Sequence, residues 1–315
     1  MPLRVNYKLV NILQNRKIIL GYVFAVTAIA IWSSNLIIAR VLNETIPPIS
    51  LAFWRWFVAV IVFLPFTLKY LIIEWDIIKK HIFYLSITAL LGVTTFNTLL
   101  YLASHTTSAI NLSLISITFP IFIIILSRIF FRELITINKY IGIILVISGI
   151  VLLITRGTLS KLLNISFVIG DVWMLIGSIV FAFYCILLKR KPDKLSLMAF
   201  LLSTFILGLI FLFPFFVWEY VTVPLVEFNI KTICLIFYLG IFASISAFIL
   251  WSKAILAIGP LKTAMTYYML PFFSGILAYF FLKEDINLIH FYSMLFIISG
   301  IFTANYEFKK GQHHD

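Results

Sequence analysis

Charged side chains are scarce in this sequence of 315 residues, and acidic ones are the scarcest. Only 11% of the residues are charged, with 12 Asp and Glu against 24 Lys and Arg. A water-soluble domain has about 25% charged and about 45–50% apolar residues, whereas 63% of this chain is hydrophobic and its mean hydropathy is +1.11. Polar side chains therefore cannot cover the molecule, and lipid must solvate most of its surface.

The positions of the few polar groups exclude several classes of function. Every acidic residue lies at the end of an apolar run, in a loop or in a tail, so the sequence offers no mid-membrane carboxylate for a proton relay or a cationic drug. Neither Cys185 and Cys234 nor the five histidines have the spacing of metal ligands. We therefore expect no metal and no cofactor. A membrane-embedded enzyme would need a nucleophile with its base, paired carboxylates or a metal cluster, so we also expect no enzymatic activity.

The excess of basic residues, +12 overall, does not indicate nucleic acid as a partner. These residues lie in short runs between apolar stretches, which is the arrangement that orients a membrane protein. With the N-terminus in the cytoplasm, 18 of the 24 Lys and Arg lie on the cytoplasmic side, five lie outside, and one, Arg55, lies within a span. This bias predicts a multi-pass protein of the cell (inner) membrane with both termini cytoplasmic.

The apolar runs are long enough to cross a bilayer, which takes about 20 residues of helix. They cover residues 18–40, 48–71, 81–103, 107–131, 138–156, 167–189, 196–219, 230–252, 260–282 and 287–306. Short connections that contain helix breakers, such as Pro47-Pro48 and Gly259-Pro260, separate them. The sequence thus predicts an all-α membrane protein with ten transmembrane helices.

The second half of the chain repeats the first. Residues 120–150 match 271–301 without a gap, with 11 identities in 31 positions at an offset of 151, and Gly21 matches Gly170 at an offset of 149. Because five is odd, the second copy must enter the membrane from the opposite side, which is the inverted repeat of many secondary transporters. We expect four segments: a cytoplasmic segment 1–17, five-helix repeats 18–156 and 157–306, and a cytoplasmic tail 307–315.

Several motifs follow one another in a characteristic order. They are Trp32-Ser33-Ser34-Asn35, Pro47-Pro48 followed by Phe53-Trp54-Arg55-Trp56, Asn97 with Tyr101, and in each half a proline followed by a glutamate and a glycine (Pro120, Glu133, Gly149 and Pro271, Glu284, Gly300). Over about residues 18–306 this order resembles the EamA-type ten-span members of the drug/metabolite transporter superfamily. The resemblance implies metabolite efflux or exchange, with amino acids a frequent substrate class.

Polar and aromatic side chains within the spans are the candidates for substrate binding. Amides in lipid need hydrogen-bond partners, so they either join helices or face the substrate, and aromatic rings either pack or stack on a flat substrate. The candidates are Trp32, Asn35, Arg55, Asn97, Tyr101, Asn111, Tyr184, Trp251, Tyr267 and Tyr268. In the second half Tyr184 stands at the position of Asn35 and Thr204 at that of Arg55, so we expect a chemically asymmetric cavity.

Two interpretations of Arg55 are open. It is either a counter-charge for a substrate carboxylate or phosphate, or an arginine that snorkels to the outer interface between Trp54 and Trp56. Pro120 and Pro271 lie about half-way along their spans, so we expect each to kink its helix and consider a gating role for both.

Together these features predict a secondary transporter that moves a small polar metabolite, foremost an amino acid, across the plasma membrane by alternating access, as an exporter or exchanger. A nucleoside or adenosyl metabolite would also suit an aromatic, amide-lined pocket, and a lipid flippase is a more distant alternative. The expected partners are the small-molecule substrate and the lipid bilayer, with the protein a monomer or a weak homodimer.

Overall fold

The computed structural model describes residues 7–107, 112, 115–116, 118–132, 136–155, 168–223, 228–282 and 288–305, and these residues form helices and no strand. The first half holds α1 (Tyr7–Leu42), α2 (Pro48–Ile73), α3 (Trp75–Lys80), α4 (Ile82–Ala89), η1 (Leu90–Thr95), α5 (Phe96–Thr106), α7 (Phe119–Phe131) and α8 (Ile137–Thr155). The second holds α10 (Ile169–Lys189), α11 (Leu197–Thr222), α12 (Ile230–Tyr238), η2 (Leu239–Ser246), α13 (Ala247–Thr266), η3 (Tyr267–Met269), α14 (Leu270–Leu282) and α15 (Leu288–Asn305).

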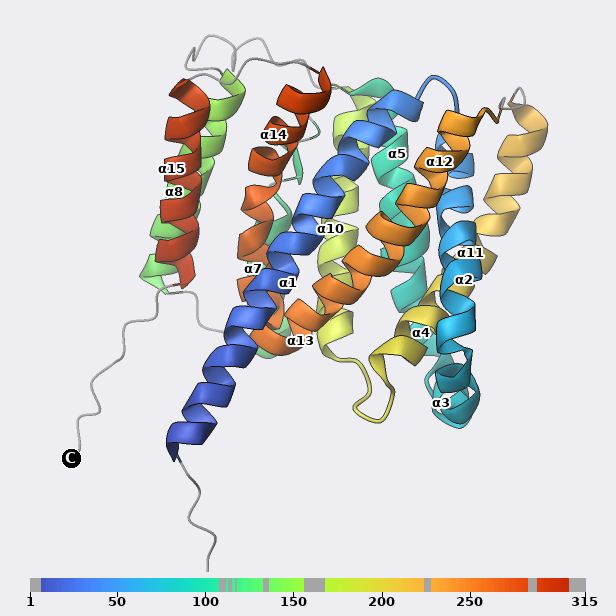
Figure 1. Ribbon diagram of the computed structural model, residues 1–315, viewed down its shortest axis with the longest axis horizontal. Coiled ribbons are helices and arrows are strands. Elements are labelled where there is room, and N and C mark those ends of the chain that lie inside the picture. The colour runs from blue at the N-terminus through green and yellow to red at the C-terminus, as the bar shows by residue number, and fades with distance from the viewer. Residues whose placement is uncertain are drawn as a thin grey trace, which may run out of the picture.

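These helices make ten spans. Within the described residues, six helical stretches are long and apolar enough to cross a membrane, and three shorter apolar helices accompany them. The longest stretch, Ile230–Leu277, holds two spans, because Gly259 has φ 84° and ψ 161° and Pro260 follows it. Only glycine adopts this backbone conformation without strain, and the chain turns back there (Figure 1). The predicted fold class, ten helices in two inverted repeats, is confirmed.

The two halves run in opposite directions. In Figure 1, α1 begins at the lower edge and α15 ends there, and we name this edge the N-terminal face and the opposite one the distal face. From its start α1 rises to the distal face, whereas α10, its counterpart, descends from the distal face to the N-terminal face. The first helix of each half therefore crosses in the opposite sense, as an inverted repeat requires.

The repeat is visible in the helix boundaries. Helices α2 and α11 have 26 residues each, and their ends are both offset by 149 residues. Helices α7 and α14 have 13 residues each at an offset of 151, and α5 and α13 also begin 151 residues apart. A π-helical segment, η1 or η2, precedes α5 and α13 respectively. Equivalent positions can therefore be paired along both halves.

Equivalent residues of the two halves also touch each other. The rings of Trp32 and Phe181, 149 residues apart, lie 5.6 Å from centre to centre. The rings of Trp56 and Phe205, also 149 apart, lie at 4.8 Å. A contact between equivalent positions lies on the axis that relates two copies. The pseudo-two-fold axis of the molecule thus passes through this aromatic core.

Helices α8 and α15 approach each other closely at two glycines. A Cβ atom on Gly142 would lie 2.5 Å from the Gly300 carbonyl oxygen, and one on Gly300 would lie 2.6 Å from the Gly142 carbonyl oxygen. Such small residues let helix backbones meet in a membrane, where dispersion forces and not water drive association. The two last helices of the repeats are therefore paired at one side of the molecule (Figure 1).

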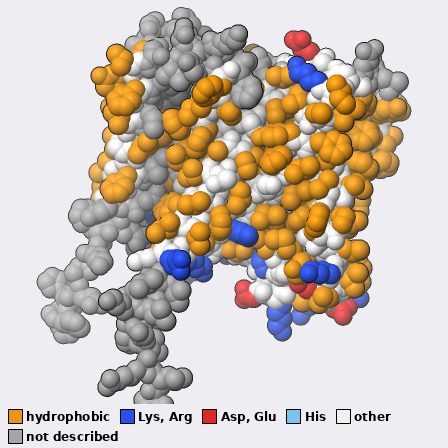
Figure 2. Space-filling model, viewed as in Figure 1, with side chains coloured by type: hydrophobic (Ala, Val, Ile, Leu, Met, Phe, Trp, Pro, Cys, Tyr) orange, Lys and Arg blue, Asp and Glu red, His pale blue; other side chains and the backbone are white. Residues whose placement is uncertain are grey.

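The surface fits a bilayer. In Figure 2 hydrophobic side chains cover the broad middle of the visible face, and Lys and Arg gather mainly along the lower edge. Large apolar residues of the spans are exposed, among them Phe66 at 73%, Ile73 at 78% and Phe83 at 78%. An exposed apolar band with charges at its edges is the surface of a membrane protein.

Two carboxylates tie α2 and α11 together, one at each end of the pair. Near the distal face, Glu219 of α11 is buried and accepts hydrogen bonds from the backbone N–H groups of Ile49 (3.1 Å) and Ser50 (2.6 Å) and from the Ser50 hydroxyl (2.7 Å). At the other face, Glu74 accepts a 2.6 Å bond from the backbone N–H of Ser196, which precedes α11. Each carboxylate thus caps the N-terminus of the other helix, where negative charge is stabilising.

Replacing Glu219 by glutamine should destabilise the fold by about 1.5–3 kcal/mol, the contribution of a hydrogen bond to a charged group. The amide keeps the shape of the side chain but loses the charge and turns one acceptor into a donor. Thermal unfolding in detergent measures the effect, with Glu44→Gln as control because Glu44 is exposed. Equal melting temperatures for the two variants would contradict the capping role.

Candidate substrate-binding site

Arg55 lies inside the bundle, and most N–H groups of its guanidinium donate hydrogen bonds. Its side chain extends from α2 and is 1% exposed. Nε donates to Ser244 Oγ at 2.6 Å, Nη1 to Asn97 Oδ1 at 2.8 Å and to the Tyr101 hydroxyl at 2.9 Å, and Nη2 to the Ala243 carbonyl at 2.8 Å. The interpretation that Arg55 snorkels to the outer interface is therefore wrong, because four bonds hold its charged head among the helices.

The positive charge of Arg55 meets no negative one among its described partners. Its four acceptors are a hydroxyl of Ser244, a hydroxyl of Tyr101, a side-chain amide and a backbone carbonyl. Burying an unpaired ion costs several kcal/mol even after the protein relaxes around it, and a charge within a membrane is usually functional. Arg55 is thus a desolvated cation that hydrogen bonds alone support.

A network of amide and phenol groups fixes the geometry around Arg55. Tyr101 accepts from Arg55 and donates to Asn35 Oδ1 at 3.0 Å. Asn97 donates its amide to the Gly92 carbonyl of η1 at 3.1 Å, and Trp32 Nε1 donates to the Ala243 carbonyl at 2.9 Å. The network therefore joins both π-helical segments, and such segments are frequent at functional sites.

Two hydrogen-bond donors of this network have no acceptor among the residues that the structure describes. Arg55 has five N–H groups, of which four are used. Asn35 accepts from Tyr101, and its own amide N–H groups are not matched by an acceptor in the described part of the chain. Both side chains line the same cavity, so a carboxylate bound there would find two donors and a positive charge.

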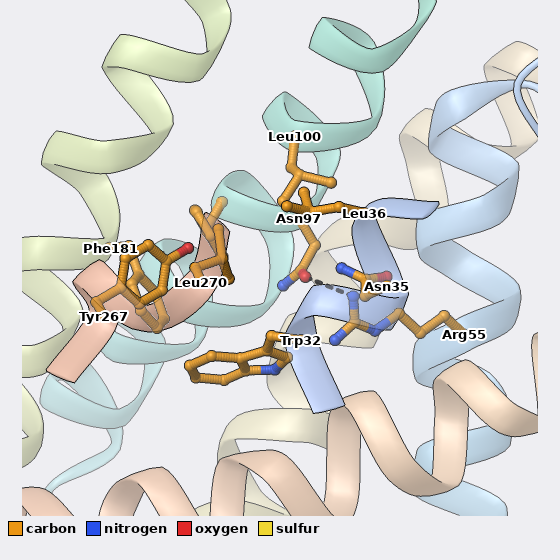
Figure 3. Close-up of a pocket in the computed structure, with 10 residues that line it drawn as sticks. Trp32, Asn35, Leu36, Arg55, Asn97, Leu100, Phe181, Tyr267 and Leu270 are labelled. Atoms are coloured by element: carbon orange, nitrogen blue, oxygen red, sulfur yellow. Dashed lines mark hydrogen bonds between the residues drawn. The ribbon is translucent and has the colours of Figure 1, made fainter. Parts of the chain in front are cut away.

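The cavity beside Arg55 is small and enclosed by helices of both halves (Figure 3). Its volume is about 20 Å³, which is room for one water molecule. Its lining consists of Trp32, Asn35, Leu36, Arg55, Phe96, Asn97, Leu100, Phe181, Tyr267 and Leu270. A metabolite can enter only after the helices move apart, so the structure represents a closed arrangement of the site.

The two sides of the cavity differ in chemistry. In Figure 3, Arg55, Asn35 and Asn97 lie on one side, while Phe181 and Tyr267 lie on the other. Further aromatic rings back the second side, with Phe119 5.0 Å from Tyr267 and Trp251 6.2 Å from it, measured between ring centres. The site can thus hold a charged or polar group at one end and an apolar or flat group at the other.

The residues predicted from sequence fall into four groups. The cavity is lined by Trp32, Asn35, Arg55, Asn97 and Tyr267. Tyr101 lies behind them in the hydrogen-bond network, and the remaining described candidates, Tyr184, Trp251 and Tyr268, are buried but do not line the cavity. Asn111 lies outside the described residues, as do Glu133 and Glu284.

Pro120 and Pro271 lie at interruptions of regular α-helix. Pro120 and Pro271 are each the second residue of an α-helix, α7 and α14. At that position the missing N–H breaks no helical bond, because the first N–H groups of a helix have no partner. A 3-10 segment, η3, precedes α14. At Pro120 the structure thus has a helix start, whereas at Pro271 the helical stretch continues from α13 through η3 into α14 with a local change to 3-10 geometry. A gating role for both prolines stays a prediction.

Several site residues carry no sequence signal. Leu36, Phe96, Leu100, Phe181 and Leu270 line the cavity but are ordinary apolar residues within apolar runs. Ser244 resembles the many serines of membrane helices, and the contribution of Ala243 is its backbone carbonyl. Only the match of equivalent helices in the two halves could have placed them near the site.

A bundle of ten apolar helices in two inverted repeats, closed around a small cavity with polar groups on one side, has the architecture of a membrane transporter. The family comparison agrees: residues 19–155 and 168–306 each match the EamA-like transporter family, and the chain belongs to it.

Known relatives support the same class. An uncharacterized transporter of Archaeoglobus fulgidus is 27% identical over 87% of this chain and 93% of its own length. The uncharacterized transporter YetK of Bacillus subtilis is 25% identical over 90% of this chain and 86% of its own length. The uncharacterized transporter YyaM of the same organism is 24% identical over 82% of this chain and 84% of its own length. A protein of known crystal structure superimposes with a TM-score of 0.72 over 90% of this chain and 96% of its own, at 15% identity, and so shares the fold.

Proposed function

We propose that the protein is a secondary transporter that carries an amino acid across the plasma membrane by alternating access, as an exporter or exchanger. The observation that carries this proposal is the buried guanidinium of Arg55, which borders a cavity and has only neutral described partners. A substrate carboxylate would supply the missing negative charge through charge-assisted hydrogen bonds. A cationic substrate would be repelled by the same group.

The other side of the cavity supports a substrate with an apolar or flat part. Phe181 and Tyr267 face the polar side, and Trp32 lies between the two sides with its indole N–H bonded to Ala243. The same aromatic side would suit the base of a nucleoside or adenosyl metabolite, which is the second candidate substrate class. An adenosyl compound that also bears a carboxylate would use both sides.

Counterflow in proteoliposomes tests the proposal. Labelled amino acids and nucleosides are offered with and without a pH gradient, and the unlabelled competitors are an amino acid, its amide and the amine that lacks the carboxylate. We expect the amino acid to compete and the amide and amine to compete at least about tenfold less well, the factor that corresponds to about 1.4 kcal/mol. Equal competition by the amine would refute the carboxylate role. Scrambling of labelled lipid with no metabolite movement would refute the metabolite carrier.

We also propose that the N-terminal face is cytoplasmic, because basic residues gather there (Figure 2). Lys80 and Glu44 are both exposed, and they lie at opposite faces. In a variant with Cys234→Ser, a membrane-impermeant thiol reagent added to whole cells should label Glu44→Cys but not Lys80→Cys. After permeabilisation both should react. Labelling of Lys80→Cys in intact cells would reverse the orientation.

A further inference from the structure

The repeat relates the Arg55 network to a second group of residues. With offsets of 149 for α1 and α2 and 151 for α5, the counterpart of Asn35 is Tyr184, that of Arg55 is Thr204, and that of Tyr101 is Ser252. Arg55 lies seven residues from the distal start of α2, and Thr204 lies seven residues from the start of α11 at the N-terminal face. At 1.5 Å per residue, each lies about 10 Å from its own face of the bundle.

This second group is neutral and has unused hydrogen-bonding groups. Tyr184 is 1% exposed and Ser252 0%; their hydroxyls lie near each other, and neither makes a hydrogen bond of good geometry with a described residue. The Thr204 hydroxyl bonds to the Leu201 carbonyl of its own helix. In the first half the counterpart of Ser252, Tyr101, is bonded on both sides. Buried hydroxyls without partners are costly, and a native structure that keeps them needs a reason.

Aromatic rings connect the two groups. Phe181 lines the Arg55 cavity and stacks on Tyr184, with ring centres 5.5 Å apart and planes at 18°. Trp251, next to Ser252 in the chain, lies 5.1 Å from Trp32, which also lines the cavity. Phe181 and Trp251 thus link the lining of the Arg55 cavity to the second group by direct packing.

From this arrangement we infer that Tyr184 and Ser252 form a second substrate subsite that is used when the bundle opens towards the N-terminal face. The inference rests on the proposed transport function. The subsite takes the same carboxylate-bearing substrate through neutral hydroxyl donors. Hydroxyls hold a carboxylate less strongly than a guanidinium does, so Arg55 is the tighter site and the Tyr184–Ser252 subsite is the weaker one, through which substrate is exchanged with that face.

The double variant Tyr184→Phe, Ser252→Ala separates this role from a packing role. Removal of two unpartnered buried hydroxyls should raise the melting temperature. The same variant should carry the amino acid with at least about tenfold lower efficiency in counterflow, the loss expected for one hydrogen bond of about 1.4 kcal/mol. Tyr84→Phe is the matched control, because the Tyr84 hydroxyl donates to the Leu187 carbonyl at 2.6 Å. It should lower the melting temperature and leave counterflow unchanged.

Three results would overturn the inference. Wild-type rates in the double variant would show that the hydroxyls play no part in transport. A lower melting temperature in the double variant would show that they have structural partners. If the wild-type protein carries no carboxylate-bearing substrate, the proposed function fails and the subsite fails with it. If the wild-type protein carries such a substrate and the double variant carries it equally well, only the subsite is refuted.

Discussion

Replacing Arg55 by glutamine is expected to lower amino-acid transport at least about 100-fold at subsaturating substrate. The substitution removes the positive charge and at least two charge-assisted hydrogen bonds, each of about 1.5–3 kcal/mol, and about 2.8 kcal/mol corresponds to a factor of 100. Stability should change much less, because removal of the buried charge of Arg55, which is 1% exposed, also removes its desolvation cost. Counterflow rates and melting temperatures measured on the same preparations separate the two effects.

Lysine should not restore transport at this position. An ammonium group is a point charge and cannot reach Ser244, Asn97 and the Ala243 carbonyl together, as the planar guanidinium does. Arg16→Gln is the control, because Arg16 is exposed near the N-terminal face and the charge change is the same. A glutamine variant of Arg55 that transports normally but melts earlier would make Arg55 a structural residue.

Replacing Gly300 by leucine should prevent α8 and α15 from pairing. Already the Cβ atom would lie 2.6 Å from the Gly142 carbonyl oxygen and 2.8 Å from the Val146 nitrogen. Both are backbone atoms, so they can give way only if the helices separate. Overpacking typically costs about 1–3 kcal/mol and occasionally more, and clashes with backbone atoms place this variant at the upper end. We expect loss of the monodisperse peak in size-exclusion chromatography and a lower melting temperature.

Replacing two glycines by alanine, one at a time, tests the packing of α8 against α15 through the direction in which the melting temperature changes. In a helix, glycine to alanine is stabilising by about 0.5–1 kcal/mol when space allows. A Cβ atom on Gly275 would meet nothing within 4 Å, so Gly275→Ala should raise the melting temperature. Gly300→Ala should lower it. A rise in both variants would show that α8 and α15 do not pack as closely as described.

Much of the architecture could be predicted because contact with lipid requires long apolar runs, which are easy to recognise in the sequence. Apolar runs of sufficient length mark the spans, and the match of Pro120 with Pro271 revealed the duplication. The duplication also predicted that Thr204 stands opposite Arg55, and the equal bounds of α2 and α11 agree with that pairing. Hydropathy and repetition act over whole helices, so small errors in register did not obscure them.

The hydrogen-bond geometry inside the site could be predicted less well from the sequence. Hydropathy does not encode the change of hydrogen-bond register in η1 and η2, which brings the carbonyls of Gly92 and Ala243 to the site. Arg55 was ambiguous because a snorkelling and a buried arginine have the same sequence context. The depth at which its head lies depends on acceptors from helices far away in the chain, such as Ser244.

The contact between Trp32 and Phe181 has a consequence for how such a site can arise. Two separate five-helix chains related by a two-fold axis would present every residue twice. A homodimeric ancestor with arginine at the position of Arg55 would carry a second arginine across the axis, and like charges in a buried site repel each other. Joining the copies into one polypeptide frees the second position, which here is Thr204. A single positive charge within a two-fold scaffold is an option that the fused chain possesses and a homodimer lacks.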